Sequence, residues 1–275
     1  MFGDDEARLA FTSLLAQAQR RSWDQGLVDD EGERAAARHG QVDPPKRLAL
    51  LSWCVTPDEW QLLLWPAGSG DICAFVRWLS MRHAQQYHLA QGTSGGGPVF
   101  RGRFRSFPVM PGGGYPQSVA RFIERHPCRL GLCETPEAWP ASSAWDRSHA
   151  RPDDGGRPTV LPADEWPGGD VLNSEDFDLL VQRPAPTAEL TALETCRRRG
   201  RPLGSDEWMS NAAQRLNLTH TLRPRGRPRK ADAAPRNLEA CTLPVAAAPA
   251  PPPPPPAGGG PAAHRRGNPR SSVAA

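Results

Sequence analysis

Three arginines spaced two residues apart are the clearest candidates for chemistry in this 275-residue sequence. Arg101, Arg103 and Arg105 alternate with a glycine and a phenylalanine inside the stretch 99–109, a pattern that predicts a β-strand. Because residues two apart on a strand point to the same face, the three guanidinium groups would form one stripe. Such a stripe can contact the phosphates of nucleic acid, although a solvated sheet face would show the same pattern.

A second basic region lies closer to the C-terminal end. Between Arg197 and Lys230 there are ten basic residues and two acidic ones, whereas residues 1–60 are rich in acids, and this asymmetry indicates a polyanionic partner. The region contains Arg-Gly-Arg-Pro twice, which resembles the AT-hook cores that enter a narrow minor groove, although a flexible basic linker is the alternative. The residues expected to contact DNA here are Arg199, Arg201, Arg225, Arg227, Arg229 and Lys230.

The six cysteines form no Cys-x-x-Cys pair. Cys128 and Cys133 are the closest in sequence, but no pair of histidines stands at zinc-ligand spacing beside them. We therefore interpret the cysteines as reduced thiols, most of which fill core positions.

The composition excludes several classes of protein. No apolar run approaches the roughly 18 residues of a membrane-spanning helix, and the acidic N-terminus lacks the apolar segment of a signal peptide. We expect a cytoplasmic, nucleoid-associated protein with no membrane partner. Residues 231–275 contain 11 of the 31 prolines, which predicts a disordered tail rich in proline and alanine.

Hydrophobic periodicity and turn residues predict an α+β fold, with helices on one face of an antiparallel sheet. The first helix begins at Asp4 or Asp5 and ends near Arg21. Its expected apolar residues are Leu9, Phe11, Leu14 and Leu15. The other expected elements are a β-hairpin at 48–55 and 60–65, a helix from Asp71 through His83 and Tyr87, the strand at 99–109, a helix from Pro116 that stops before Pro127, and helices at 187–199 and 205–217.

Seven stretches, in order along residues 1–230, share one resemblance. They are 53–66, which reads Trp-Cys-Val-Thr-Pro-Asp-Glu-Trp-Gln-Leu-Leu-Leu-Trp-Pro, and 75–79, 97–109, 121–132, 139–145, 199–204 and 222–230. Together they resemble the REP-associated tyrosine transposases. These are relatives of the insertion-sequence-200-like transposases, in the His-hydrophobic-His class of nucleases.

The resemblance implies a catalytic centre whose residues are replaced. In that family two histidines, one residue apart on a strand, bind a divalent cation, and a tyrosine on a helix attacks the scissile phosphate. The histidine positions correspond to Glu59 and Gln61 here, and the tyrosine position to Phe122. His126 stands one turn later on the same helix face, at the position of a polar helper. The resemblance therefore implies a transposase descendant with no intact set of catalytic residues.

A substitute site is chemically conceivable. The oxygens of Glu59 and Gln61, with the imidazole of His126, are a weak ligand set for Mg²⁺ or Mn²⁺, and the family resemblance is the only other reason to expect such a cofactor. The alternative is drift after selection ceased. Tyr115 lies about 10 Å before Phe122 along a helix, so we do not expect it to replace the nucleophile.

The resemblance also implies a ferredoxin-like sheet that lacks the family's first strand, either because Met1 is not the true start or because the gene is truncated. The neighbouring strand would then have unpaired backbone groups, which should weaken the fold. The expected organisation is a transposase-like domain at 1–150 with an insertion at about 22–46, an irregular connector at 151–186, a basic helical region at 187–230, and the tail at 231–275.

Three functional hypotheses follow. The first is a transposase-family protein that keeps DNA recognition but no longer cleaves and rejoins single-stranded DNA. Its expected partners are a single-stranded hairpin or an AT-rich duplex, with a possible homodimer. The second is a repurposed DNA-binding regulator, and the third is a relic that does not fold stably.

Overall fold

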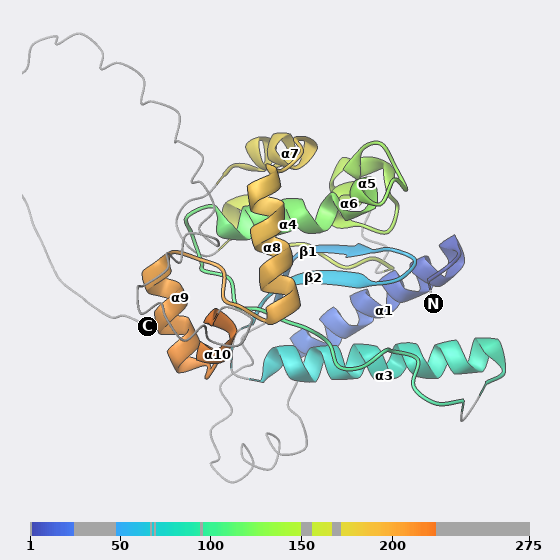
Figure 1. Ribbon diagram of the computed structural model, residues 1–275. Helices are drawn as coiled ribbons and strands as arrows, with labels where there is room; N and C mark the ends of the chain where they lie inside the picture. The colour runs from blue at the N-terminus through green and yellow to red at the C-terminus, as the bar shows by residue number, and fades with distance from the viewer. Residues whose placement is uncertain are drawn as a thin grey trace, which may run out of the picture. The chain divides into compact units, whose positions relative to one another are not determined.

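The computed structural model describes residues 2–24, 48–66, 68, 70–93, 96–149, 156–166 and 172–223 (Figure 1). Most of the expected insertion, the second Arg-Gly-Arg-Pro core with Arg225, Arg227, Arg229 and Lys230, and the tail lie outside the described residues. The described elements are α1 (Asp5–Asp24), β1 (Ala49–Val55), β2 (Trp60–Trp65), α3 (Asp71–Gln91), α4 (Tyr115–Glu124), α5 (His126–Arg129), η1 (Pro136–Ala138), α6 (Ser143–Ser148), η2 (Ala163–Glu165), α7 (Ser174–Gln182), α8 (Thr187–Arg199), α9 (Asp206–Arg215) and α10 (Thr219–Leu222).

Helices and an antiparallel pair of strands confirm the α+β class. β1 pairs with β2 in the predicted hairpin, with one irregularity between Leu50 and Ser52. The turn is closed by Thr56, whose N–H and hydroxyl both donate to the carbonyl of Glu59, at 2.8 and 3.1 Å. This turn fixes Glu59 at the entrance to β2.

No described helix is long and apolar enough to span a bilayer.

Helices cover both faces of the hairpin, so the expectation of helices on one face is wrong (Figure 1). Alternate strand residues enter two separate cores, because side chains alternate between the faces of a strand. One core joins α1 and α3 to the hairpin and includes Phe11, Leu14, Leu50, Trp53, Phe75 and Leu79. The other joins α4, α7, α8 and α9 to the hairpin and includes Leu51, Cys54, Leu63, Phe122, Ile123, Phe177, Leu193 and Met209.

The helices predicted from periodicity are largely confirmed. The Asp4 carboxylate accepts a hydrogen bond from the N–H of Ala7 at 2.7 Å, which caps α1. Leu9 does not belong to the buried stripe of α1, because its side chain is 47% exposed. α3 buries Phe75, Val76, Leu79 and His83, and α8 and α9 form the expected final pair. The connector at 151–186 is not wholly irregular, because it contains η2 and α7.

α4 begins at Tyr115, one residue before the expected start. Residues 112–114 are glycines with positive φ angles of 85°, 62° and 72°, a conformation that other residues rarely adopt. Pro116 stands in the first turn, where its missing N–H costs nothing. The helix ends at Glu124, and α5 carries Pro127 in its own first turn.

The stretch 99–109 is not a strand. Apart from an isolated bridge between Val109 and Leu203, its residues form bends and irregular chain. Gly102 has a φ of 103°, which breaks the alternation of an extended strand, and Pro108 lacks an N–H donor. The regular spacing of the arginines therefore does not produce a common sheet face.

The outer edge of β1 is covered by later parts of the chain. The N–H of Val55 donates to the carbonyl of Ala141 at 2.9 Å, and the Ser143 hydroxyl bonds both the N–H and the carbonyl of Trp53, at 3.0 and 3.2 Å. Two further hydrogen bonds reach this edge, from Trp139 Nε1 to the Val55 carbonyl and from the Leu161 N–H to the Leu50 carbonyl. The expected row of unpaired backbone groups is therefore not found along this edge.

Candidate functional site

The start of β2 and the α4–α5 pair bring together the residues that the resemblance singled out. Glu59 and Gln61 are two residues apart, so both point to the face of the hairpin that α4 covers. His126 is the first residue of α5, and its Nε2 lies 2.7 Å from Oε1 of Glu59. Phe122 lies one turn earlier, with 4% of its surface exposed.

The carboxylate of Glu59 is the centre of this group. Gln61 Nε2 donates to Oε1 at 2.7 Å, and Nη1 of Arg197 donates to both oxygens, at 3.0 and 2.8 Å. The hydrogen bond from His126, together with the charge of Arg197, lowers the pKa of Glu59 from 4.5 to about 2, although burial acts in the opposite direction. Glu59 is therefore a carboxylate with both oxygens engaged.

Arg129 lies on the other side of His126. Its Nη2 is 3.2 Å from Nδ1 of His126, and since a guanidinium can only donate, Nδ1 is the acceptor. The proton that His126 donates to Glu59 is then carried on Nε2. The guanidinium of Arg129 also lies 4.0 Å from the centre of the Phe122 ring, a cation–π contact. Burial lowers the pKa of Arg129 to about 10.

These five residues form what we call the Glu59 cluster: Glu59, Gln61, His126, Arg129 and Arg197. The cluster does not suit a divalent cation. A metal ion bound to Glu59 would have to displace the guanidinium of Arg197 and would meet the charge of Arg129 nearby. The described residues also contain no group of three or more His, Cys, Asp or Glu side chains placed to bind a metal.

Arg197 was not identified from the sequence as part of this site. It belongs to α8, and 138 positions separate it from Glu59. Local spacing cannot indicate such a contact. The acid itself gives no signal either, because Glu59 is partly exposed and a partly exposed carboxylate does not require a cationic partner.

The two tyrosines lie outside the Glu59 cluster. Tyr115 is buried in the core beneath α4, two helical turns from Phe122, and burial, with the charge of Asp206, raises its pKa. Tyr87 lies on α3, where its ring centre is 6.3 Å from that of His83. Neither phenol is placed to act as the missing nucleophile.

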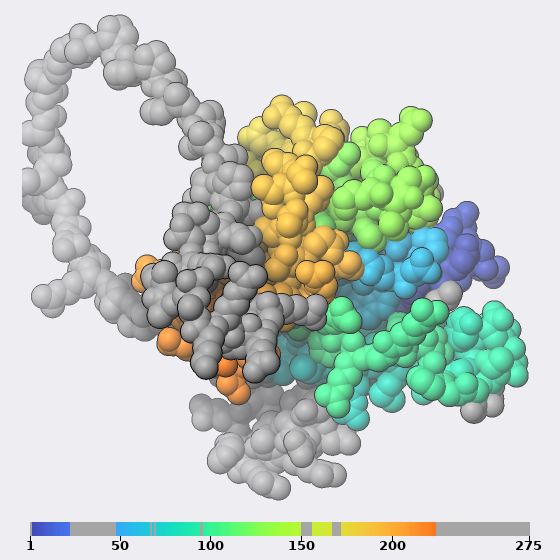
Figure 2. Space-filling model, in the orientation of Figure 1, coloured from blue at the N-terminus to red at the C-terminus, as the bar shows by residue number. Residues whose placement is uncertain are grey.

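The predicted DNA-contacting arginines occupy an exposed segment, residues 99–110, which we call the arginine segment. Arg101, Arg103 and Arg105 are all exposed, and none forms an ion pair with another described residue. The start of the segment folds back along α3 (Figure 2), where the Phe100 ring centre lies 5.5 Å from that of His83.

The end of the arginine segment joins the first Arg-Gly-Arg-Pro core. The N–H of Leu203 donates to the carbonyl of Pro108 at 2.9 Å, and the N–H of Met110 donates back to Leu203 at 2.8 Å. Two basic stretches that are about 95 positions apart in sequence therefore lie side by side. Sequence reasoning identified both stretches but not their pairing.

The first core does not have the exposed form that an AT-hook requires. Arg201 is only 6% exposed, and its Nε and Nη2 have no acceptor among the described residues. Arg199 Nη2 donates to the carbonyl of Arg223. Pro202 and Leu203 are buried, so the interpretation of 199–202 as a free minor-groove hook is wrong for this conformation.

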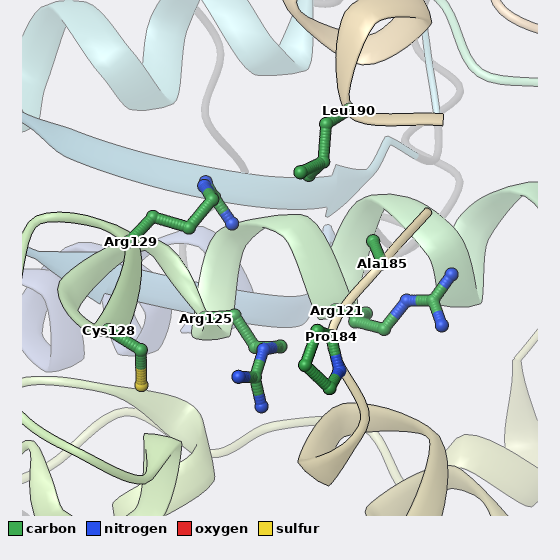
Figure 3. A pocket seen from close by; sticks show the side chains of 7 residues that line it. All are labelled: Arg121, Arg125, Cys128, Arg129, Pro184, Ala185 and Leu190. Atoms are coloured by element: carbon green, nitrogen blue, oxygen red, sulfur yellow. The ribbon is translucent and has the colours of Figure 1, made fainter. Parts of the chain in front are cut away.

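A small pocket beside α4 and α5 is lined by three arginines, one of which is Arg129 of the Glu59 cluster. Arg121, Arg125 and Arg129 follow one another at helical spacing, and Figure 3 shows their guanidinium groups pointing in different directions. Arg121 pairs with Glu189, and Arg125 donates to the carbonyls of Val181 and Gln182 at 3.1 and 2.6 Å. The remaining lining residues are Cys128, Pro184, Ala185 and Leu190. The three arginines do not converge on one point, so this pocket is not a chelating site.

No family model, curated protein or solved structure matches the chain.

Proposed function

We propose that this chain is a DNA-binding protein, descended from REP-associated tyrosine transposases, that binds DNA without cleaving it. The observation that carries the proposal is the meeting of Glu59, Gln61 and His126 beside Phe122. The resemblance expects these four positions to be close in space although they come from a hairpin and a helix pair far apart in sequence. A chance resemblance in scattered short stretches has no reason to predict this proximity.

The same positions support the loss of cleavage. Phe122 has no hydroxyl with which to attack a phosphate, and a guanidinium lies over its ring. Glu59 is neutralised by Arg197 and so is not free to bind the metal that would polarise the phosphate. Both halves of the family's chemistry, the nucleophile and the Lewis acid, lack the groups that they need.

DNA binding is supported by the arginine segment and its neighbour. The three exposed arginines carry charge that no described carboxylate neutralises, and Arg198, Arg215 and Arg223 are exposed around the adjoining stretch. Exposed, unpaired guanidinium groups on a bent segment suit contacts to phosphates rather than to base edges. A repurposed DNA-binding regulator, which is the second hypothesis, would bind DNA through the same surface.

The test is a fluorescence titration of the purified chain against a hairpin oligonucleotide and an AT-rich duplex, each at low and moderate salt. We expect the hairpin to be preferred and the preference to persist at moderate salt. Weak binding that is indifferent to DNA form and vanishes with salt would contradict the proposal, because it would indicate only non-specific contact with polyanions. A cooperative thermal melt of the same sample excludes the unfolded relic.

A further inference from the structure

Cys128 and Cys133 lie side by side, which the sequence spacing alone did not reveal. Their Sγ atoms are 3.5 Å apart, and both side chains are partly exposed to solvent. Both are free thiols in this structure. The separation is that of two sulfur atoms in contact, and a disulfide would shorten it to about 2.05 Å.

The local backbone explains the proximity. Gly131, with a φ of 70°, ends α5 in the left-handed conformation. The N–H of Leu132 donates to the carbonyl of Pro127, and the N–H of Gly131 donates to that of Cys128, both at 3.0 Å. These two bonds form a Schellman motif, which reverses the chain at a helix end. The reversal brings Cys133 back against the last turn of α5, beside Cys128.

We propose that Cys128 and Cys133 are a dithiol pair that forms a reversible intramolecular disulfide when the protein meets a hydroperoxide. This modification site does not depend on the proposed DNA-binding function. In the first step the thiolate of Cys128 attacks one oxygen of hydrogen peroxide, so that an S–O bond forms and the O–O bond breaks. Cys128 becomes a sulfenic acid, and the released hydroxide takes up a proton and becomes one molecule of water. In the second step the sulfur of Cys133 attacks the sulfenic sulfur, so that an S–S bond forms and the S–O bond breaks. The departing hydroxide takes the Cys133 proton and leaves as a second molecule of water.

The surroundings assign the order of the two steps. Burial, and then the hydrogen bond with Cys128, raise the pKa of Cys133 to about 12, so its thiol stays protonated at neutral pH. The thiolate is the form that attacks peroxide, and of the two cysteines only Cys128 lines the pocket, so Cys128 is assigned the first step and Cys133 the second. Cys128 lies on the pocket wall of α5, where a small oxidant reaches it.

The other described cysteines provide controls. Cys73 is exposed on α3, and no contact between it and another described cysteine is found, whereas Cys54 and Cys196 are buried. The charge of a Cys133 thiolate contributes to raising the pKa of Cys54, so these two thiols also lie near each other. A bond between Cys133 and Cys54 is therefore the competing outcome that an experiment has to distinguish.

The chain offers a direct assay. Trypsin cuts after Arg125 and Arg129, so Cys128 and Cys133 end in two separate peptides that only a disulfide can join. The full-length protein is treated with hydrogen peroxide, its free thiols are alkylated, and the digest is analysed by mass spectrometry without reductant. We expect one joined pair, lighter than the two peptides by two hydrogen atoms, which disappears after treatment with dithiothreitol.

Three variants sharpen the assay. Cys133→Ser should trap the sulfenic acid on Cys128, where a dimedone-type probe labels it, and Cys128→Ser should yield no joined pair. Cys73→Ser should behave as the wild type. Alkylation of both thiols after peroxide treatment of the folded protein would overturn the proposal. So would a Cys54–Cys133 bond, or a dimedone-labelled Cys128 that persists in the wild type.

Discussion

The Glu59 cluster and the arginine segment place arginines in opposite electrostatic conditions. In the Glu59 cluster, Arg197 lies 2.8 Å from the carboxylate of Glu59. The guanidinium of Arg129 donates to the His126 imidazole and lies over the ring of Phe122. In the arginine segment, three guanidinium groups are exposed, and none of them forms an ion pair with a carboxylate of the described residues.

This contrast separates two properties that an active transposase needs together. A site for metal-assisted cleavage needs carboxylate or imidazole ligands that are free to bind a metal ion. Here the Glu59 carboxylate pairs with Arg197, and the His126 imidazole accepts a hydrogen bond from Arg129. A surface for phosphates needs uncompensated cations, and here the exposed arginines of the arginine segment supply them. This arrangement is the one that the proposed function, DNA binding without cleavage, requires.

Acid should destabilise the two regions at different pH values, and this loss of folding stability is the largest effect that we expect. Burial lowers the pKa of His83 from its ordinary 6.5 to about 4, and the His83 ring packs against Phe100 at the start of the arginine segment. Since the folded pKa lies below the unfolded one, stability is intact above pH 6.5 and is lost as the pH falls toward 4, by about 3 kcal/mol.

The Glu59 cluster should lose stability only at lower pH. The folded pKa of Glu59, about 2, lies below its ordinary 4.5, so its contribution is complete above pH 4.5 and is lost as the pH falls toward 2. Thermal melts between pH 7 and pH 2 measure both steps. His83→Leu should remove the loss between pH 6.5 and 4 and leave the lower step. An unchanged pH profile in that variant would contradict the assignment.

Replacement of the exposed arginines should lower the affinity for DNA while leaving the free energy of unfolding almost unchanged. The combined change Arg101→Ala, Arg103→Ala and Arg105→Ala should lower affinity roughly tenfold to a hundredfold and reduce the slope of log affinity against log salt by about 3. Fluorescence titration at several salt concentrations measures both quantities.

The matched control removes the same charge elsewhere. Arg77, Arg82 and Arg183 are exposed and lie outside the arginine segment, so their combined change to alanine should alter affinity much less. Equal losses in the two triple variants would show that net charge alone, and not the arginine segment, determines binding.

Replacement of Glu59, the centre of the Glu59 cluster, should have the smallest effect on folding stability and on DNA affinity. Glu59→Gln removes the charge that pairs with Arg197, and since Glu59 is partly exposed we expect a loss of only about 1 kcal/mol in the free energy of unfolding. DNA affinity should rise slightly, because Arg197 regains an uncompensated charge. Glu194→Gln is the control, since Glu194 is exposed and also contacts Arg197, at 3.0 Å. A larger destabilisation by Glu194→Gln would contradict the central place of Glu59.

Local patterns in the sequence predicted the elements that local interactions form. The hairpin follows from two short apolar runs around a Pro-Asp turn, and α4 follows from Pro116 and Pro127. The arginine segment was predicted wrongly as a strand, because alternation is a strand signal only where a partner strand exists, and Gly102 turns the chain away. The pairing of Arg197 with Glu59 and the cover over β1 depend on contacts between distant positions, for which a single sequence carries no local signal.

The most direct test of binding without cleavage is a search for a covalent protein–DNA adduct. The wild-type chain and Phe122→Tyr are incubated with a hairpin oligonucleotide and Mg²⁺ or Mn²⁺, and the mixtures are separated by electrophoresis in SDS. We predict bound DNA before denaturation and no SDS-stable adduct in either sample, because the restored tyrosine would still lack a metal site. An adduct in the wild type that disappears in Tyr115→Phe would contradict the account, since it would reveal a working nucleophile.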